Sequence, residues 1–365
     1  MNPAQSTQNG ISHHDDEALP TVVITGISGA LGRRLVAAIA QSGDWKVVGL
    51  DTAWFPAGVA KPRHFTVHRV DLRSADCAKL FAAAHAVVHL AADDPTRAGD
   101  ASLTRSTTER VLQAAAAARV GQLVVMSSAT VYGAYADNPV PLTEDAPLKP
   151  NPGFQYAAAK AEVELLVERW RQSHPEMKIA VLRPAVTLGH PESRSWLADA
   201  VRPGVADRLG HALPAVQYVH VEDVATAVLH AAAMGLDGAF NVAADDWLQS
   251  EDAHALMGLG ARLPLPEWLA SAVQKLADLR PGVRRPTGAL PYSKFPWVVA
   301  TDRLRSTGWV PLSTSAEAFV ANKKPSEAAL YFAKHRQEVT LAGVGILGVL
   351  AASALSWLGL RSRRK

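Results

Sequence analysis

Short runs of β-branched residues alternate with alanine-rich segments along the first half of the chain, and this alternation limits the possible fold more than any other feature. The runs predict strands at residues 21–25, 46–51, 65–71, 86–91, 122–128 and 178–184, and the segments predict helices at 30–41, 102–120 and 154–172. Strands that alternate with helices at this spacing form βαβ units. The sequence therefore predicts an α/β protein built on a doubly wound parallel sheet.

A glycine-rich loop, TGISGALG at residues 25–32, joins the first predicted strand to the first predicted helix. Glycines three residues apart let the backbone turn tightly and approach a pyrophosphate, which the N–H groups and dipole of the following helix attract. A strand before the loop and a helix after it are typical of a Rossmann-type dinucleotide site. We expect the following residues to contact the cofactor: Gly26, Ser28, Gly29, Ala30, Leu31 and Gly32.

Asp51 ends the second predicted strand, 19 residues after Gly32. A carboxylate at this position accepts hydrogen bonds from the adenosine ribose 2′-OH and repels a 2′-phosphate. NAD is therefore the expected cofactor and NADP is disfavoured, although Arg33 and Arg34 offer cations that a 2′-phosphate could use. Asp71 and Leu72, after the third strand, are expected to flank the adenine ring.

Tyr156 and Lys160 open the helix that follows the fifth predicted strand. Residues four apart share one face of a helix, so the phenol and the ammonium project together. A nearby positive charge lowers the pKa of a phenol, and Tyr156 is then expected to exchange a proton with a substrate alcohol or carbonyl. Lys160 is also placed to hold the nicotinamide ribose hydroxyls, and Ser128 to bond the same substrate oxygen as Tyr156.

These features together resemble the extended short-chain dehydrogenase/reductase superfamily, in its NAD-dependent epimerase/dehydratase branch. The resemblance covers residues 21–309 and includes VVHLAA at 87–92, SSATVYG at 127–133, YAAAK at 156–160, RPAVTLG at 183–189 and HVEDVA at 220–225. It implies an enzyme with a catalytic triad of Ser128, Tyr156 and Lys160 and with hydride transfer at the nicotinamide. It also places Leu90, Ala91, Ala92 and Pro184 at the cofactor, and it implies a homodimer.

The chain is expected to divide into a dinucleotide-binding domain and a smaller, C-terminal substrate-binding part. We expect a leader at 1–17, the Rossmann domain at 18–186, the substrate-binding part at 187–325 and a linker at 326–339. The resemblance implies that residues 218–244, which lie within the substrate-binding part of the sequence, fold back into the Rossmann core. Trp196, Trp247, Trp268 and Trp297 are candidates for lining an apolar pocket there, with ordinary core packing as the alternative.

Departures from the family pattern bear on the substrate. Ala129 and Thr130 stand where dehydratases of the family carry an Asp-Glu pair, and Val186 stands where sugar-nucleotide epimerases typically carry asparagine. Thr104 and Thr107 replace an asparagine and a glycine that family members usually show. We therefore expect an apolar substrate, sterol-like or lipid-linked. A nucleotide-sugar epimerase with tightly held NAD and a non-catalytic dinucleotide sensor are the alternatives.

The stretch from Thr340 to Leu360 contains no charged residue. At a rise of about 1.5 Å per residue, a helix of this length spans about 30 Å, the thickness of a bilayer's hydrocarbon core. The sequence thus predicts a C-terminal transmembrane helix at 340–360, followed by a basic tail at 361–365. Four basic residues after the span, against Lys334 and Arg336 before it, favour a cytoplasmic C-terminus. An enzyme of this kind needs the cytosolic dinucleotide pool, however, so we expect the catalytic body on the cytoplasmic side. The short tail then crosses the membrane, or the helix is re-entrant or lies in the interface.

The net charge of +3 does not indicate nucleic-acid binding. Arg361, Arg363, Arg364 and Lys365 supply four positive charges at the end of the chain, so the rest of it carries −1. The basic residues therefore form a local tail rather than a patch on the body. The single cysteine, Cys77, excludes an internal disulfide framework, and no metal site is expected.

Overall fold

The computed structural model describes residues 19–91, 101–189, 196–201, 214–249 and 288–321, together with residues 252 and 256. For residues 101–103 it describes the backbone alone. These ranges all belong to one unit, Met1–Asn322. The predicted transmembrane helix at 340–360, the linker at 326–339, Ala92 and Trp268 lie outside the described residues.

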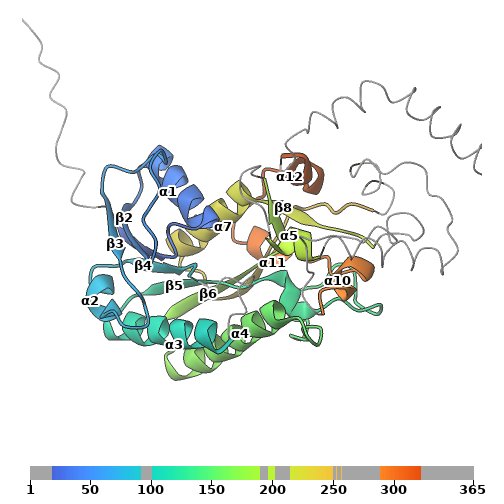
Figure 1. Cartoon of the computed structure of the whole chain (residues 1–365), viewed down its shortest axis with the longest axis horizontal. Coiled ribbons are helices and arrows are strands. Elements are labelled where there is room, and N and C mark those ends of the chain that lie inside the picture. The colour runs from blue at the N-terminus through green and yellow to red at the C-terminus, as the bar shows by residue number, and fades with distance from the viewer. Residues whose placement is uncertain are drawn as a thin grey trace, which may run out of the picture. The chain divides into compact units, whose positions relative to one another are not determined.

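A seven-stranded parallel sheet forms the centre of the fold, in the order β3-β2-β1-β4-β5-β6-β9 (Figure 1). Its strands are β1 (Thr21–Thr25), β2 (Lys46–Asp51), β3 (Phe65–Arg69), β4 (Ala86–His89), β5 (Gln122–Met126), β6 (Lys178–Pro184) and β9 (Gly238–Val242). Every neighbouring pair is parallel. The predicted Rossmann-type α/β sheet is confirmed, and its strand order reverses between β1 and β4.

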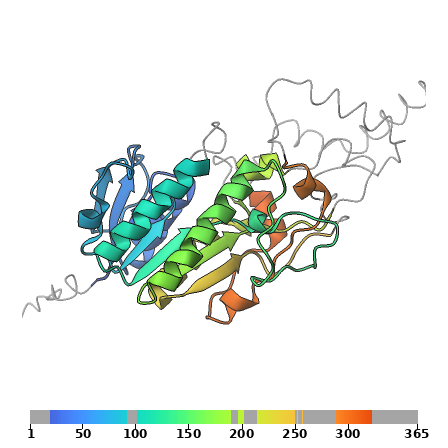
Figure 2. The same cartoon turned by 90° about the horizontal axis from the view of Figure 1, so that it is seen from below.

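Helices cover both faces of this sheet (Figures 1 and 2). One face packs under α1 (Ala30–Ser42) and α7 (Val221–Met234), which bury Leu35, Ile39 and Val228. The opposite face packs under α2 (Cys77–Phe81), α3 (Ala101–Ala117) and α4 (Gln155–Ser173). Side chains alternate between the faces of a strand, so Val22 and Val23 of β1 belong to different cores.

Three strands end earlier than predicted, and each does so at its carboxyl end. β3 ends at Arg69, β4 at His89 and β5 at Met126, whereas the sequence pattern extended them to residues 71, 91 and 128. The backbone leaves the sheet there because polar groups take other partners: Asp71, for example, accepts turn hydrogen bonds from Ser74 and Ala75. These three departures all lie on the edge of the sheet where the candidate site is found.

The remaining described elements extend the fold beyond the carboxyl edge of the sheet. They are η1 (Ala129–Tyr132), a short parallel pair of β7 (Val186–Leu188) and β8 (Tyr218–His220), α5 (Trp196–Ala200), α10 (Pro291–Lys294), α11 (Asp302–Arg305) and α12 (Ser315–Ala321). After β8 the chain runs through α7 into β9, which pairs with β6. Among the helices that the structure describes, none combines the length and apolar character that a membrane span requires.

Candidate active site at the carboxyl edge of the sheet

The glycine-rich loop lies against the end of β4, where the strand order reverses. Gly26 has a φ of +73°, and a Cβ atom there would lie 2.7 Å from the backbone nitrogen of Ala91. Leu90 N donates to Thr25 O at 3.1 Å, which ties the two strand ends together. Ligands of open α/β sheets bind at this switch point. The structure therefore brings Leu90 and Ala91 to the glycine loop, and their contact with the cofactor stays a prediction.

The first turn of α1 is open to an anion. Gly29 precedes the helix without a side-chain cap, and no acidic residue lies in the first turn. Gly32 is buried against the loop, where a Cβ atom would lie 2.4 Å from Ile27 O. The free N–H groups and positive dipole end at Ala30 and Leu31 suit a pyrophosphate, so the cradle fits a dinucleotide.

Asp51 and Ser28 are hydrogen-bonded to each other at the end of β2. Ser28 N donates to Asp51 Oδ2 at 2.9 Å, and Ala53 N donates to Oδ1 at 2.9 Å. The carboxylate is thereby fixed beside the glycine loop, and each oxygen keeps a lone pair for a ribose hydroxyl.

Asp71 and Leu72 follow β3 but have different surroundings. Arg73 donates to both oxygens of Asp71, at 2.6 to 3.1 Å, and these bonds lower the pKa of Asp71 to about 2. The side chain of Leu72 is buried in the core beneath α2 and α3. Their predicted contact with an adenine ring stays a prediction.

Ser128, Tyr156 and Lys160 lie around the carboxyl end of β5. Ser128 Oγ accepts hydrogen bonds from Thr130, at 3.3 Å from its backbone N–H and 3.0 Å from its hydroxyl. Ser128 also hydrogen-bonds the Tyr156 phenol, which lies in the first turn of α4. Lys160 lies one helical turn further on and donates from Nζ to Met126 O at 2.8 Å. Ser128 and Tyr156 are therefore neighbours, and Lys160 lies one turn from Tyr156 on the same helix.

The predicted effect of Lys160 on the Tyr156 phenol is wrong for this arrangement. Desolvation raises the pKa of Tyr156 above its ordinary value, and the hydrogen bond from Ser128 offsets part of that rise. Burial also lowers the pKa of Lys160 to about 8, against the opposing charge of Glu164. The lysine directs its ammonium at a backbone carbonyl, so burial outweighs its influence on the phenol. Tyr156 is consequently a protonated phenol at neutral pH.

Aromatic rings surround Tyr156. Its ring lies edge-on to Trp196 with centroids 5.3 Å apart, and Phe154 lies 6.0 Å from Tyr156 and 6.1 Å from Trp196. Tyr292 packs against Phe154 at 5.1 Å. Trp297, by contrast, is buried and donates from Nε1 to Tyr292 O, which is ordinary core packing. Trp247 is partly exposed, and of Trp196 and Trp297 only Trp196 contacts the candidate catalytic residue.

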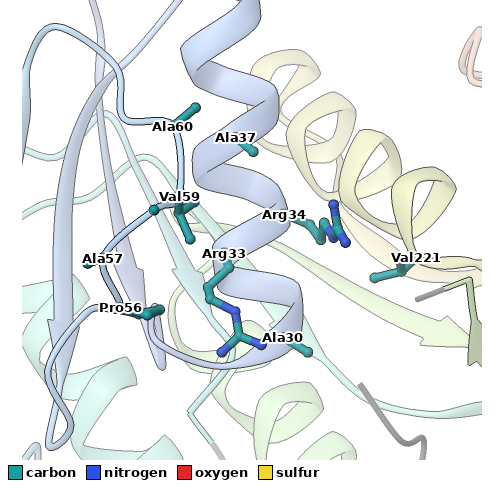
Figure 3. Close-up of a pocket in the computed structure, with 10 residues that line it drawn as sticks. Ala30, Arg33, Arg34, Ala37, Pro56, Ala57, Val59, Ala60 and Val221 are labelled. Carbon is teal, nitrogen blue, oxygen red and sulfur yellow. The ribbon is translucent and has the colours of Figure 1, made fainter. Parts of the chain in front are cut away.

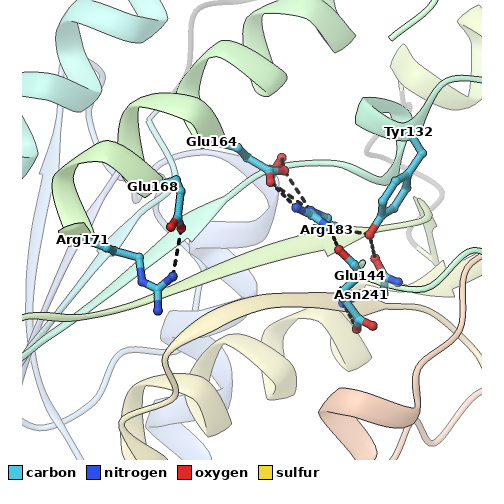
Figure 4. A network of polar contacts seen from close by, with 8 residues as sticks. Tyr132, Glu144, Glu164, Glu168, Arg171, Arg183 and Asn241 are labelled. Carbon is cyan, nitrogen blue, oxygen red and sulfur yellow. Dashed lines mark hydrogen bonds and ion pairs between the residues drawn. The ribbon is translucent and has the colours of Figure 1, made fainter. Parts of the chain in front are cut away.

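A buried polar network supports the site from behind (Figure 4). Arg183 of β6 donates to both oxygens of Glu164 on α4, the shortest contact being 2.6 Å, and to the Tyr132 hydroxyl at 2.6 Å. Tyr132 in turn donates to Asn241 Oδ1 at 2.7 Å. Ser127 donates to Glu164, so the residue before Ser128 is anchored to the same pair. Pro184 follows Arg183 at the buried end of β6.

Two histidines, His89 and His220, make structural contacts near the site. His89 is buried between Thr25 Oγ1, at 2.8 Å from Nδ1, and Thr108 Oγ1, at 3.2 Å from Nε2. Desolvation and the charge of Lys160 lower the pKa of His89 to about 3, so it is neutral. His220 caps α7 by accepting a hydrogen bond from Glu222 N at 3.3 Å.

The positions that depart from the family pattern are mostly buried. Ala129 and Thr130 are fully buried in η1, and Val186 is buried in the apolar core beside Tyr218 of β8. Thr104 is buried on α3, whereas Thr107 is partly exposed. Thr130 has a role that the sequence analysis missed, because its two hydrogen bonds orient Ser128. The sequence does contain a signal for this role, because a residue with a hydroxyl group stands two positions after Ser128.

Comparisons with known proteins agree with this geometry. The model of the NAD dependent epimerase/dehydratase family matches residues 22–243. The chain is 27% identical over 268 residues to an uncharacterised protein of Mycobacterium tuberculosis (strain ATCC 25618 / H37Rv), covering 69% of each. It is 28% identical over 232 residues to the dTDP-glucose 4,6-dehydratase of Streptomyces niveus, covering 57% of this chain and 67% of that protein.

A solved structure of similar fold is the UDP-glucose 4-epimerase of Thermus thermophilus in complex with NAD. Its TM-score to this chain is 0.58 at 22% identity, over 83% of this chain and 98% of that one. At this level of identity, the similarity shows the fold alone.

Proposed function

Because the chain belongs to the NAD dependent epimerase/dehydratase family and is an NAD-dependent enzyme, we propose that it oxidises or reduces a hydroxyl-bearing carbon through Ser128, Tyr156 and Lys160. The family membership confirms the expected enzyme class and the expected cofactor. The observation that carries the proposed roles is the hydrogen bond between Ser128 and Tyr156 beside the dinucleotide cradle. NAD, when bound, supplies the hydride acceptor or donor.

Each side chain has a role that its contacts support. Tyr156 gives its phenolic proton to a substrate carbonyl oxygen, or accepts the proton of a substrate hydroxyl in the opposite direction. Ser128 Oγ accepts two hydrogen bonds from Thr130, so its own hydroxyl proton is available to donate to the phenol or to the substrate oxygen. Lys160 is buried and tied to Met126, where it holds positive charge close to the same end of β5.

The direct test is Tyr156→Phe, with Tyr135→Phe as the matched control. Removal of a general acid–base group typically costs about a hundredfold to ten-thousandfold in rate. We expect Tyr156→Phe to lose turnover by that factor while its Kd for NAD stays unchanged, and Tyr135→Phe to behave as wild type. Full turnover by Tyr156→Phe would refute the role, and a sensor without chemistry would show no turnover in any variant.

We propose an apolar substrate, sterol-like or lipid-linked. The rings of Trp196 and Phe154 flank Tyr156, and Val186, which is buried in the core, offers no hydrogen bond where sugar-nucleotide epimerases typically carry asparagine. The full chain should then reduce NAD stoichiometrically with one member of a panel of hydroxysteroids and lipid alcohols. Trp196→Ala should raise KM for that alcohol and leave the Kd of NAD unchanged.

Nucleotide-sugar epimerisation is the second candidate, and the similarity to the dTDP-glucose 4,6-dehydratase of Streptomyces niveus favours nucleotide-sugar chemistry. An epimerase oxidises and re-reduces the same carbon, so it shows no net change in NADH. Interconversion of a nucleotide sugar by the full chain, without accumulation of NADH and without reaction of any apolar alcohol, would establish this candidate instead.

We propose that the catalytic body is cytoplasmic and that residues 340–360 anchor it to a membrane. The uncharged stretch supports the anchor, and the need for the cytosolic dinucleotide pool supports the position of the body. The four basic residues after the stretch, against Lys334 and Arg336 before it, favour instead a cytoplasmic C-terminus. The full chain should sediment with membranes and resist alkaline carbonate, whereas a chain ending at residue 339 should not. Release of the full chain by carbonate would contradict the anchor. The homodimer stays a prediction that light scattering would check.

A further inference from the structure

The segment that joins β2 to β3 presents a tryptophan to solvent. Trp54 is 75% exposed, more than any other tryptophan that the structure describes. The next residue, Phe55, packs against the apolar core, and so does Val59 further along, so the segment is held on the body. Figure 3 shows its middle part, residues 56–60, beside α1 and across an open pocket of about 530 Å³. A large apolar ring is thus exposed on a segment that is packed in place.

Cationic side chains lie over the aromatic rings of this region. The Arg69 guanidinium carbon is 5.4 Å from the centre of the Trp54 ring. Lys61 Nζ is 5.8 Å from the centre of the Phe55 ring and 5.6 Å from that of Phe65, and the two rings are 5.0 Å apart. Phe65 and Arg69 are four residues apart on β3 and so lie on one face of the strand, which joins the two groups. We call these five residues the Trp54 patch.

The Trp54 patch carries positive charge without a compensating carboxylate. Residues 52–70 contain three cationic side chains, two histidines and no aspartate or glutamate. Lys61 and Arg69 are exposed, and neither forms an ion pair with a described residue. The next carboxylate along the chain, Asp71, is hydrogen-bonded to Arg73. The body therefore has a local cationic surface in addition to the basic tail, and the sequence analysis did not predict it.

Two features favour an anionic bilayer as the partner of this surface. Tryptophan prefers the membrane–water interface because its ring is apolar and its N–H is polar. Lysine and arginine are attracted to the negative surface of a cytoplasmic leaflet. The proposed anchor at 340–360 also keeps the body near lipid, since residues 322–339 span at most about 60 Å. A tethered patch meets that surface at a high effective concentration.

We propose that the Trp54 patch binds the headgroup layer of an anionic bilayer, with Trp54 among the headgroups and Lys61 and Arg69 at the lipid phosphates. The inference goes beyond the proposed chemistry and rests on the proposed cytoplasmic position of the body. It turns the β2–β3 side of the sheet, where β3 is the last strand, toward the membrane. Cations on an edge strand also discourage pairing with another chain, and a patch with that role alone does not respond to lipid.

The test attaches an apolar fluorophore to Trp54→Cys in the full chain and mixes the chain with vesicles that contain a lipid-bound quencher. The native Cys77 is buried, so the label goes to the introduced cysteine. Met234→Cys is the matched label position, because Met234 is 58% exposed at the end of α7, at the opposite edge of the sheet. With vesicles of phosphatidylcholine and phosphatidylglycerol, we expect quenching at position 54 and not at position 234. With phosphatidylcholine alone, quenching at position 54 should be lost.

Charge reversal separates lipid binding from a structural role. Each basic residue near an anionic surface contributes about fivefold in affinity, so Lys61→Glu should lower the ratio of lipid-bound to free label at position 54 by about fivefold or more. Lys178→Glu, which reverses an exposed cation at the start of β6, should leave that ratio unchanged. Equal effects of the two variants would overturn the proposal.

Three further results would also overturn it. Equal quenching at positions 54 and 234 means that no face of the body prefers lipid. A label at position 54 that stays in water with anionic vesicles means that the patch does not bind them, whether or not residues 340–360 insert. Protection of that label by a single-stranded oligonucleotide and not by lipid assigns the patch to nucleic acid. None of these results depends on NAD, so the proposed function is tested separately.

Discussion

Replacing Glu164 with glutamine would remove the negative charge from the buried ion pair behind the candidate active site. Glu164 and Arg183 are 4% and 7% exposed, and Arg183 donates three hydrogen bonds to the carboxylate. The substitution leaves a guanidinium buried without a counter-charge. Removal of one partner from a buried pair costs about 3–5 kcal/mol of unfolding free energy.

The matched control lies one helical turn along α4. Glu168 accepts a hydrogen bond from Arg171 at 3.0 Å, but its side chain is 57% exposed (Figure 4). Exposed pairs of this kind contribute about 0–1 kcal/mol. Glu168→Gln therefore makes the same chemical change on the same helix, without burial.

Thermal unfolding monitored by circular dichroism measures the difference. For a domain of this size, about 1 kcal/mol shifts Tm by about 2–4 °C, so Glu164→Gln should lower Tm by roughly 6–20 °C. Glu168→Gln should lower it by less than about 4 °C. Equal shifts in the two variants would refute the reasoning, because the buried geometry would then contribute nothing beyond an exposed pair.

Three single residues give further predictions. Gly26→Ala should abolish NAD binding or folding, because its Cβ atom would lie 2.7 Å from Ala91 N at a φ of +73°; unchanged NAD affinity would contradict this. His89→Gln should flatten the acid dependence of stability, since the folded pKa of His89 is about 3 against 6.5 unfolded, so that wild type loses stability as pH falls below 6.5. From pH 7 to pH 5 wild type should lose about 2 kcal/mol more than the variant in urea unfolding, and parallel curves would disprove it. Alcohol oxidation needs deprotonated Tyr156, whose pKa burial raises, so initial rates should increase with pH across the alkaline range; a pH-independent rate would exclude Tyr156 as the base.

Local sequence patterns determined the sheet and the cofactor cradle. The runs at 21–25, 46–51 and 178–184 became β1, β2 and β6 with the predicted bounds. These patterns are β-branched runs, the glycine spacing and the YAAAK spacing, and each extends over only a few residues. Over such a distance, backbone geometry alone determines in which direction a side chain at a given position points. For that reason the sequence also brought Tyr156 and Lys160 to one face of α4 and the glycine loop to the switch point.

The tertiary structure alone decided the electrostatics of the site. Whether the pKa of Tyr156 is raised or lowered depends on burial and on where Lys160 directs its ammonium. The structure raises this pKa, whereas the sequence pattern predicted that it would be lowered. The Glu164–Arg183 pair joins a helix to a strand, and Arg34 pairs with Glu222 because α7 packs beside α1. Desolvation and ion pairing are properties of what surrounds a group in space, which residue spacing along the chain does not encode.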